Sequence, residues 1–262
     1  MDLQLTDKVF FVAAASKGLG YAIAQQLVLN GASVAIASRD QAAISAAAQV
    51  LADESGQTVK AYVMDASDGA SIQTAISSAI GDFGRLDGLL VNAGGPPPGS
   101  FEDFDDSDWQ AAFELTLMSA VRMVNAVLPE LKKRGGAILA ITSSTVKEPA
   151  PIMLLSNVMR SAVSSLVKTL SRQYAGDGIR VNNLIPGLIY TDRVKSLDVA
   201  QAQRTGGSVE QAKTENEANI PLGRYGDPME FGKVGAFLLS DAASYVTGAT
   251  LTVDGGTMKS LF

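Results

Sequence analysis

The sequence predicts an α/β protein built on a single doubly wound parallel sheet (Rossmann-like), with helices on both faces. Apolar runs of strand length alternate with segments of helical periodicity, and each apolar run is continuous rather than alternating. Strands that helices cover on both faces show such continuous runs. With 262 residues the chain lies near the upper end of one α/β domain, so we expect a single domain over residues 1–262.

The expected elements follow one another along the chain. The strand-like runs are KVFFVAAA (8–15), SVAIAS (33–38), VKAYVM (59–64), LDGLLVNAG (86–94), GAILAITSS (136–144) and IRVNNLIPG (179–187). The helical segments lie at 20–31, 41–54, 69–83 and 108–134, and another begins near Leu154. A polar interruption from Tyr190 to about Pro221 follows the last of these strands. Such sheets bind ligands at the carboxyl ends of their strands, so we expect a mobile substrate lid at about 190–221; a solvated helical insertion is the alternative.

The composition excludes several classes of chemistry. The chain has no cysteine and no histidine, which rules out disulfides, thiolate nucleophiles, histidine triads and ordinary zinc sites, so we expect no metal. A net charge of −6 without a basic run argues against nucleic acid as a partner. Acidic residues precede a short apolar run at the N-terminus, and no apolar stretch approaches membrane length. We therefore expect a cytoplasmic protein without a signal peptide or membrane span.

A glycine-rich turn, AAASKGLGYAIA, joins the first expected strand to the first helix. Gly18 and Gly20 let the backbone approach a ligand closely, and the helix N-terminus offers free N–H groups to a phosphate. Lys17 adds a positive charge beside them. In this strand–turn–helix context the turn predicts a nucleotide site.

The residues at the end of the second expected strand favour NADP(H) over NAD(H). Ser38 stands where an NAD site holds an acidic residue for the ribose 2′-hydroxyl, and Arg39 follows it. An uncharged serine beside Arg39 and Lys17 suits a 2′-phosphate. Asp40 precedes a helical segment, so we expect it to cap that helix rather than to bind ribose.

Several further motifs occur in order: SKGLG (16–20), MDAS (64–67), NAGG (92–95), IRVNNLIPG followed by Thr191, and YVTGATLTVDGG (245–256). With these pieces the chain resembles the short-chain dehydrogenase/reductase family, and among its members the β-ketoacyl-acyl-carrier-protein reductases. The resemblance covers essentially the whole chain and implies a homo-oligomer, most simply a tetramer. The cofactor contacts that it implies are Ala14, Ser16, Lys17, Gly18, Leu19 and Gly20 in the turn, Asp65 and Ala66 at the adenine, Asn92, Ala93 and Gly94 at the adenosine ribose, and Pro186, Gly187, Ile189 and Thr191 at the nicotinamide.

The chain departs from the family pattern at its catalytic positions. The family uses Asn, Ser, Tyr and Lys; the matching positions here are Thr116, Ser143, Ser156 and Arg160, so only the serine remains. The family's Thr-Gly before the glycine turn also reads Ala13-Ala14, which places a Cβ where a tight turn usually has none and predicts weaker cofactor binding.

These departures affect proton transfer more than binding. Ser156 is a much weaker acid than tyrosine and too short to reach the same carbonyl. Arg160 can still bridge ribose hydroxyls, but a guanidinium does not shuttle protons at ordinary pH. An ordered water held between Ser156 and Arg160 is one possible proton source; Lys147, Glu148 and Tyr190 are others, although surface exposure is the simpler interpretation of these three.

Three functions compete at this stage. The first is an atypical NADPH-dependent carbonyl reductase of 3-oxoacyl type, which acts on a small carbonyl or alcohol substrate. The second is a catalytically silent NADP(H)-binding sensor or scaffold, for which a lid over the nicotinamide has little use. The third is a halohydrin dehalogenase, which resembles this family and carries arginine in place of lysine. That enzyme keeps the tyrosine and replaces the nicotinamide side by a halide pocket, so it matches least well.

Overall fold

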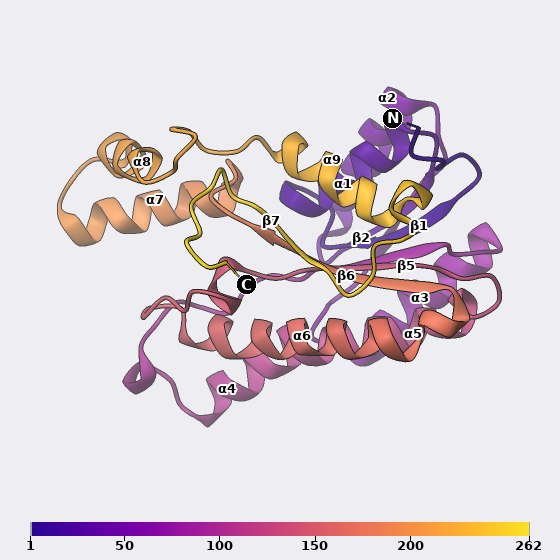
Figure 1. Ribbon diagram of the computed structural model, residues 1–262, viewed down its shortest axis with the longest axis horizontal. Helices are drawn as coiled ribbons and strands as arrows, with labels where there is room; N and C mark the ends of the chain where they lie inside the picture. The colour runs from indigo at the N-terminus through magenta and orange to yellow at the C-terminus, as the bar shows by residue number, and fades with distance from the viewer. Residues whose placement is uncertain (1, 262) are drawn as a thin grey trace.

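The computed structural model describes residues 2–261, which form one seven-stranded parallel sheet in the order β3-β2-β1-β4-β5-β6-β7 (Figure 1). The strands are β1 (Val9–Ala13), β2 (Ser33–Ser38), β3 (Val59–Val63), β4 (Gly88–Val91), β5 (Gly136–Ile141), β6 (Ile179–Pro186) and β7 (Thr250–Val253). The α-helices are α1 (Gly18–Leu29), α2 (Gln41–Ser55), α3 (Gly69–Phe83), α4 (Asp106–Ala112), α5 (Ser119–Leu131), α6 (Leu154–Gln173), α7 (Asp192–Thr205), α8 (Val209–Ala218) and α9 (Pro228–Leu239). The predicted fold class is confirmed; β7 and α9 had not been expected.

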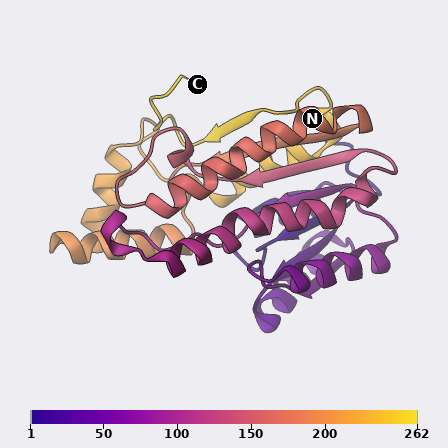
Figure 2. The same cartoon turned by 90° about the horizontal axis from the view of Figure 1, so that it is seen from below.

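Helices cover both faces of the sheet because successive strand residues point to opposite sides. In β1, Phe10 and Val12 pack in one core with residues of α1, α2 and α9. Phe11 and Ala13, which alternate with them, pack in a second core with α3, α5 and α6. These three helices run across the lower face of the sheet (Figure 2). The central strands β1, β4 and β5 are apolar along their whole length because each must fill two cores at once.

The expected single helix at 108–134 is interrupted. A π-helical stretch at Phe113–Met118, labelled η2, separates α4 from α5. The combined run Asp106–Leu131 is apolar and long enough to cross a membrane by length and composition alone. It nevertheless carries the ion pair of Arg122 with Glu114 at 2.6 Å, and α5 packs against α3, β4 and β5. Its environment is that of a core helix. Single-turn π segments often accompany functional sites, and Thr116 lies in this one.

The order and direction of the strands determine at which edge of the sheet the candidate site lies. The strands are all parallel, so the segments after β1, β4, β5 and β6 leave the sheet at the same edge. The order reverses between β1 and β4, since β1 continues to β2 on one side and to β4 on the other. A crevice at such a reversal is where open α/β sheets bind their ligands.

Close contact between α1 and α9 generates a test of the packing. A Cβ on Gly232 would lie 2.5 Å from the backbone oxygen of Ala22, which cannot move without shifting α1. Gly232→Ala should therefore destabilise the protein by about 1–3 kcal/mol through overpacking. Gly81, inside α3, has no atom within 4 Å of its ideal Cβ, so Gly81→Ala should stabilise by about 0.5–1 kcal/mol.

Thermal unfolding at fixed protein concentration measures both variants, and 1 kcal/mol corresponds to a Tm shift of about 2–4 °C at this size. The Gly232 variant should melt below the wild type and the Gly81 variant above it. Equal Tm values for the two variants would contradict the close approach of α9 to α1.

Candidate active site

The glycine turn after β1 has the form of a phosphate cradle. Lys17 is the N-cap of α1 and its side chain makes no cap bond, so the first N–H groups of the helix point outward without a side-chain partner. Gly18 has φ +67°, and a Cβ on Gly20 would lie 2.5 Å from the carbonyl oxygen of Ala14. Across the crevice, Gly94 faces open space, with no atom within 4 Å of its ideal Cβ. These residues fit a dinucleotide phosphate.

Ala14 adopts a left-handed conformation with φ +50°. The family has glycine at this position, and alanine pays a conformational cost there. The turn is held in place by Asn92, whose Nδ2 lies 3.4 Å from the Ala14 carbonyl oxygen. The Cβ expected at this position is therefore present and is accommodated by backbone strain rather than by a change of fold.

Lys17 has a partner that sequence reasoning did not supply. Its Nζ lies 3.0 Å from Oδ2 of Asp192, the first residue of α7, and both side chains are well exposed. The ion pair lowers the pKa of Asp192, first through the hydrogen bond from Lys17 and then through its charge. Lys17 thus links the glycine turn to the start of the expected lid instead of standing free for a 2′-phosphate.

The residues expected around the adenosine lie at the ends of β2 and β3. Ser38 is partly buried, with its hydroxyl 3.4 Å from the carbonyl oxygen of Asp40, and Arg39 is exposed. Hydrogen bonds from Ser67, and to a lesser extent the charge of Arg39, lower the pKa of Asp65. Asp40 accepts from the backbone N–H of Ala43 at 2.9 Å, so its predicted capping role is confirmed.

The segment after β6 turns back toward the glycine turn. Pro186 ends the strand, and Ile189 is buried against Gly226. Thr191 is the N-cap of α7, and its methyl group would lie 3.8 Å from a Cβ on Gly18. The nicotinamide-side residues and the phosphate cradle therefore face the same crevice.

Ser143 lies two residues after the end of β5. Its oxygen accepts from the backbone N–H of Thr145 at 3.2 Å and from the Thr145 hydroxyl at 3.1 Å. Apart from these contacts with Thr145, the Ser143 hydroxyl forms no hydrogen bond within residues 2–261. Neighbouring Thr142 instead donates its hydroxyl to Oδ1 of Asn183 at 2.8 Å, a hydrogen bond between the ends of β5 and β6. Of these two hydroxyls at the carboxyl end of β5, the Ser143 hydroxyl is the one that can donate to a bound ligand.

Arg160 reaches the same strand end from α6. Its Nη1 donates to the carbonyl oxygens of Ile141 at 3.1 Å and Thr142 at 3.4 Å. Burial, and then the positive charge of Arg193, lower the pKa of Arg160 to about 10. The side chain still carries its charge at neutral pH, and no carboxylate forms an ion pair with it in the part of the chain described.

The other two catalytic positions are buried beside it. Ser156 lies one helical turn before Arg160 and is 3% exposed. Thr116 lies in η2, which packs against α6, and its hydroxyl is buried without a hydrogen-bond partner. Its carbonyl oxygen accepts from the Ser119 hydroxyl at 3.1 Å. Neither hydroxyl forms a hydrogen bond to Ser143 or Arg160, so the four positions share one region without forming a proton relay.

The three alternative proton donors are surface groups. Lys147 ends the short helix η3 (Ser144–Val146), and Oε1 of Glu148 accepts from the backbone N–H groups of Lys259 and Ser260 at 2.6 and 2.7 Å. Glu148 therefore ties down the C-terminal segment. Tyr190 is 46% exposed, and Nζ of Lys195 lies 4.9 Å from its ring centre.

Arg193 was missed by the sequence analysis. A Cβ on Gly95 would lie 3.6 Å from Nη2 of Arg160 and 4.0 Å from Nη2 of Arg193, so the two guanidinium groups meet above Gly95. The one signal in the sequence was a cation two residues after Thr191 in a segment expected to flank the nicotinamide.

The expected lid contains α7 and α8, which form a lobe at one end of the molecule (Figure 1). Asp198 of α7 is buried and accepts from Nδ2 of Asn216 at 3.0 Å and from the Tyr225 hydroxyl at 2.7 Å. Burial and the bond to Asp198 raise the pKa of Tyr225. One buried carboxylate thus joins the two helices to the segment that follows them.

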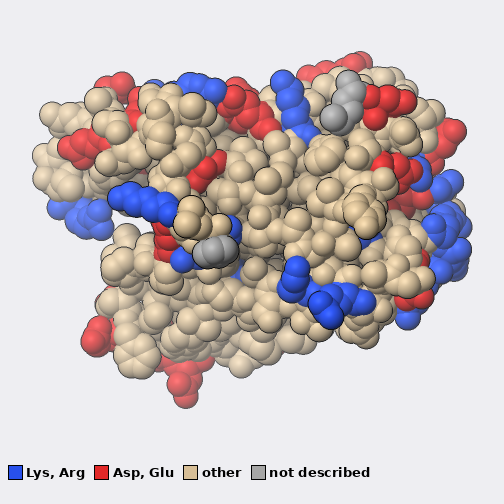
Figure 3. Space-filling model, in the orientation of Figure 1, with Lys and Arg blue, Asp and Glu red and all other residues tan. Residues whose placement is uncertain are grey.

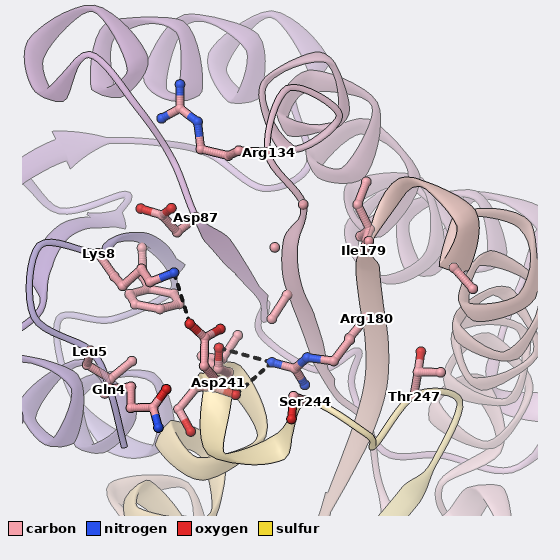
Figure 4. Close-up of a pocket in the computed structure, with 18 residues that line it drawn as sticks. Gln4, Leu5, Lys8, Asp87, Arg134, Ile179, Arg180, Asp241, Ser244 and Thr247 are labelled. Carbon is pink, nitrogen blue, oxygen red and sulfur yellow. Dashed lines mark hydrogen bonds and ion pairs between the residues drawn. The ribbon is translucent and has the colours of Figure 1, made fainter. Parts of the chain in front are cut away.

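A cavity of about 390 Å³ lies at the opposite edge of the sheet (Figure 4). It is lined by the amino ends of the strands and by the segment after α9. Lys8 pairs with Asp241 at 3.0 Å, and Arg180 donates to the carbonyl oxygens of Leu238 and Ser240 at 2.8 Å, which closes the C-terminal end of α9. The charged side chains that line this cavity stabilise the fold through these contacts. None of the predicted site residues lines the cavity.

The chain is similar to known proteins over nearly its whole length. Residues 13–258 match the family model described as Enoyl-(Acyl carrier protein) reductase. The 3-oxoacyl-[acyl-carrier-protein] reductase FabG of Chlamydia trachomatis serovar D is 31% identical over 253 residues, which cover 96% of this chain and 98% of that protein. L-sorbose reductase from Gluconobacter frateurii, solved with NADPH and L-sorbose, has a TM-score of 0.95 at 30% identity and 100% coverage of both chains.

A third relative is also a solved structure. The NADPH-bound short chain oxidoreductase from Pseudomonas aeruginosa PAO1, described as containing an atypical catalytic center, has a TM-score of 0.87 at 30% identity, with 98% of this chain and 99% of that chain covered. This chain belongs to the short-chain dehydrogenase/reductase family. The resemblance drawn from its motifs is confirmed.

The strain at Ala14 generates a test. Ala14→Gly removes the conformational cost of a left-handed alanine in the folded state, roughly 1–2 kcal/mol. Glycine also raises the entropy of the unfolded state, which offsets about 0.4–1 kcal/mol of that gain in stability. The variant should melt above the wild type. NADPH, titrated by nicotinamide fluorescence, should bind it at least as tightly.

Ala13→Gly is the matched control, because Ala13 is fully buried in β1 with ordinary backbone angles. That change should lower Tm. A lower Tm for both variants would show that Ala14 is not strained.

Proposed function

We propose that this protein is an NADPH-dependent carbonyl reductase of atypical site, with 3-oxoacyl compounds as its nearest substrate class. One observation carries the proposal: the hydroxyl of Ser143 and the partly buried guanidinium of Arg160 both lie at the end of β5, on the edge of the sheet that also holds the glycine cradle. Bound NADPH supplies a hydride. The chain must then stabilise negative charge on the former carbonyl oxygen.

The two residues divide that work. Ser143 donates its O–H to the developing oxyanion, and the adjacent positive charge of Arg160 stabilises the same oxygen through a short path of low dielectric. Neither gives up a proton at neutral pH, because a serine hydroxyl is a weak acid and Arg160 stays charged. The proton comes from water, and turnover is slower than with a tyrosine acid by about 10²–10⁴-fold, the usual worth of general acid catalysis.

The cofactor preference rests on Arg39 at the end of β2. Arg39 is exposed, and the residue before it, Ser38, is not acidic. Its positive charge also helps to lower the pKa of Asp65, which lies on the expected adenine side. These features support a 2′-phosphate partner. Lys17 contributes after release from Asp192, so we propose that NADPH binding exchanges this ion pair for one with the cofactor.

We propose residues 1–262 as a single domain with α7 and α8 as its substrate lid. The exposed Lys17–Asp192 pair joins the lid to the cradle and can break at little cost. We also propose a cytoplasmic homotetramer. Large apolar side chains remain exposed outside the site, Val158 on α6 and Leu251 on β7 among them. Light scattering at micromolar concentration should give four chains per particle; a monomer would contradict the assembly.

Ser143 provides the direct test of the catalytic assignment. Ser143→Ala should lower kcat by roughly 10²-fold or more, by analogy with loss of an oxyanion donor, while the Kd for NADPH stays within about twofold. Ser144→Ala is the control, because Ser144 has no side-chain role in the site. Equal kcat values for the two variants would contradict the assignment. Activity is followed as NADPH consumption with 3-oxoacyl thioesters, diketones and quinones.

Arg39 tests the cofactor assignment. Wild-type protein should bind NADPH more tightly than NADH, and Arg39→Glu should weaken NADPH binding by about tenfold or more through loss of a charge-assisted bond. Arg172→Glu, at the exposed end of α6, is the control for net charge. A preference for NADH that survives Arg39→Glu would remove the argument. A protein that binds NADPH and reduces no carbonyl would be a sensor of the same fold.

A further inference from the structure

Two arginine side chains converge in the site without an acidic partner. Nη2 of Arg160 and Nη2 of Arg193 would lie 3.6 and 4.0 Å from a Cβ placed on Gly95. Arg160 comes from α6 and Arg193 from the first turn of α7, so two elements far apart in the chain bring these cations together.

The nearby groups do not neutralise the pair. Arg160 uses Nη1 for two backbone carbonyl oxygens, which leaves Nη2 directed toward Gly95. Asp192 is next to Arg193 in sequence, but its two oxygens face Lys17 at 3.0 Å and Lys195 at 3.7 Å. Within residues 2–261, no ion pair of Arg160 or Arg193 is formed.

Like charges brought this close repel each other, and burial of one of them strengthens the repulsion. The positive charge of Arg193 contributes to the lowered pKa of Arg160, which reports the same interaction. The N-terminus of α7 adds further positive potential on that side. An anion that accepts from both Nη2 groups would replace this repulsion by two charge-assisted bonds.

We propose that Arg160 and Arg193 bind a carboxylate of the substrate, which makes the substrate an oxo acid rather than a neutral thioester. This rests on the proposed function, because Ser143 then receives the carbonyl oxygen. Arg160 is bonded to the backbone beside Ser143, so the carboxylate and the reduced carbonyl are separated by only one or two carbon–carbon bonds. The substrate is a short 2- or 3-oxo acid.

The surface is consistent with entry of an anion. A notch separates the lobe of α7 and α8 from the lobe below it, and Lys and Arg side chains lie at its mouth (Figure 3). The net charge of the whole chain is −6, so this local positive potential runs against the overall balance. Local positive charge in a cleft raises the concentration of anionic ligands there.

A matched pair of substrates tests the proposal. Acetoacetate and methyl acetoacetate present the same ketone with and without a negative charge. With wild-type protein and NADPH, KM for acetoacetate should be at least tenfold below KM for the ester. Arg193→Gln should raise KM for acetoacetate by about 10- to 100-fold, the worth of a charge-assisted bond, and should raise KM for the ester by a much smaller factor. Arg204→Gln, on the last turn of the same helix, removes an equal charge and should change neither KM.

Binding without turnover separates this proposal from the function on which it rests. Calorimetry with malonate, which cannot be reduced, should detect binding to the wild type and to Arg193→Lys, and at least tenfold weaker binding to Arg193→Gln. NADPH affinity should be the same in all three proteins.

Each other outcome overturns the idea. If Arg193→Gln weakens the binding of NADPH as much as the binding of malonate, the two arginines hold a phosphate of the cofactor. If NADPH binds normally and the ester is reduced as well as the acid, the substrate is neutral and the reductase assignment stands. If malonate shows no dependence on Arg193, no carboxylate site exists, whether or not NADPH binds.

Discussion

The attachment of the Arg160 guanidinium to the carbonyl oxygens of Ile141 and Thr142 is the constraint around which the site is arranged. It fixes a mostly buried positive charge at the end of β5, directly beside Ser143. Lysine, with a single flexible ammonium, could not hold two carbonyl oxygens with one nitrogen and direct a second nitrogen toward Gly95. Once that charge is fixed, the site is suited to stabilising negative charge and poorly suited to moving protons.

The remaining features follow from this charge. Ser156, one turn away, is small and buried, and no side chain near Arg160 acts as an acid. In the proposed mechanism the hydroxyl of Ser143 supplies the hydrogen bond toward the carbonyl oxygen. Arg193 approaches from the lid, so the pose of α7 determines how much positive potential the site holds. The exposed Lys17–Asp192 ion pair joins the start of α7 to the glycine turn.

The sequence was sufficient to predict the fold and the edge of the sheet at which the candidate site lies. It was not sufficient to predict which side chains contact one another there. Apolar runs identified six of the strands, and in five of these both faces are buried, β3 at the sheet edge being the exception. β7 was missed because its TLTV run is short and only partly buried. The expected helix at 108–134 could not reveal η2, since a π-helical turn leaves the apolar periodicity intact over a few residues. Ser143 and Arg160 were located by spacing, whereas the Lys17–Asp192 pair and the approach of Arg193 join residues more than thirty positions apart in sequence and have no local pattern.

The pH dependence of kcat tests most directly whether a fixed charge has replaced a proton donor. Burial lowers the pKa of Arg160 to about 10, so its charge is complete well below that pH and is lost as pH rises through it. Arg193 is the charged group that faces it. We predict that kcat for carbonyl reduction is level from about pH 6 to 9 and falls as pH approaches 10. A break near neutral pH with a slope of one would show that a side chain donates the proton and would contradict this account.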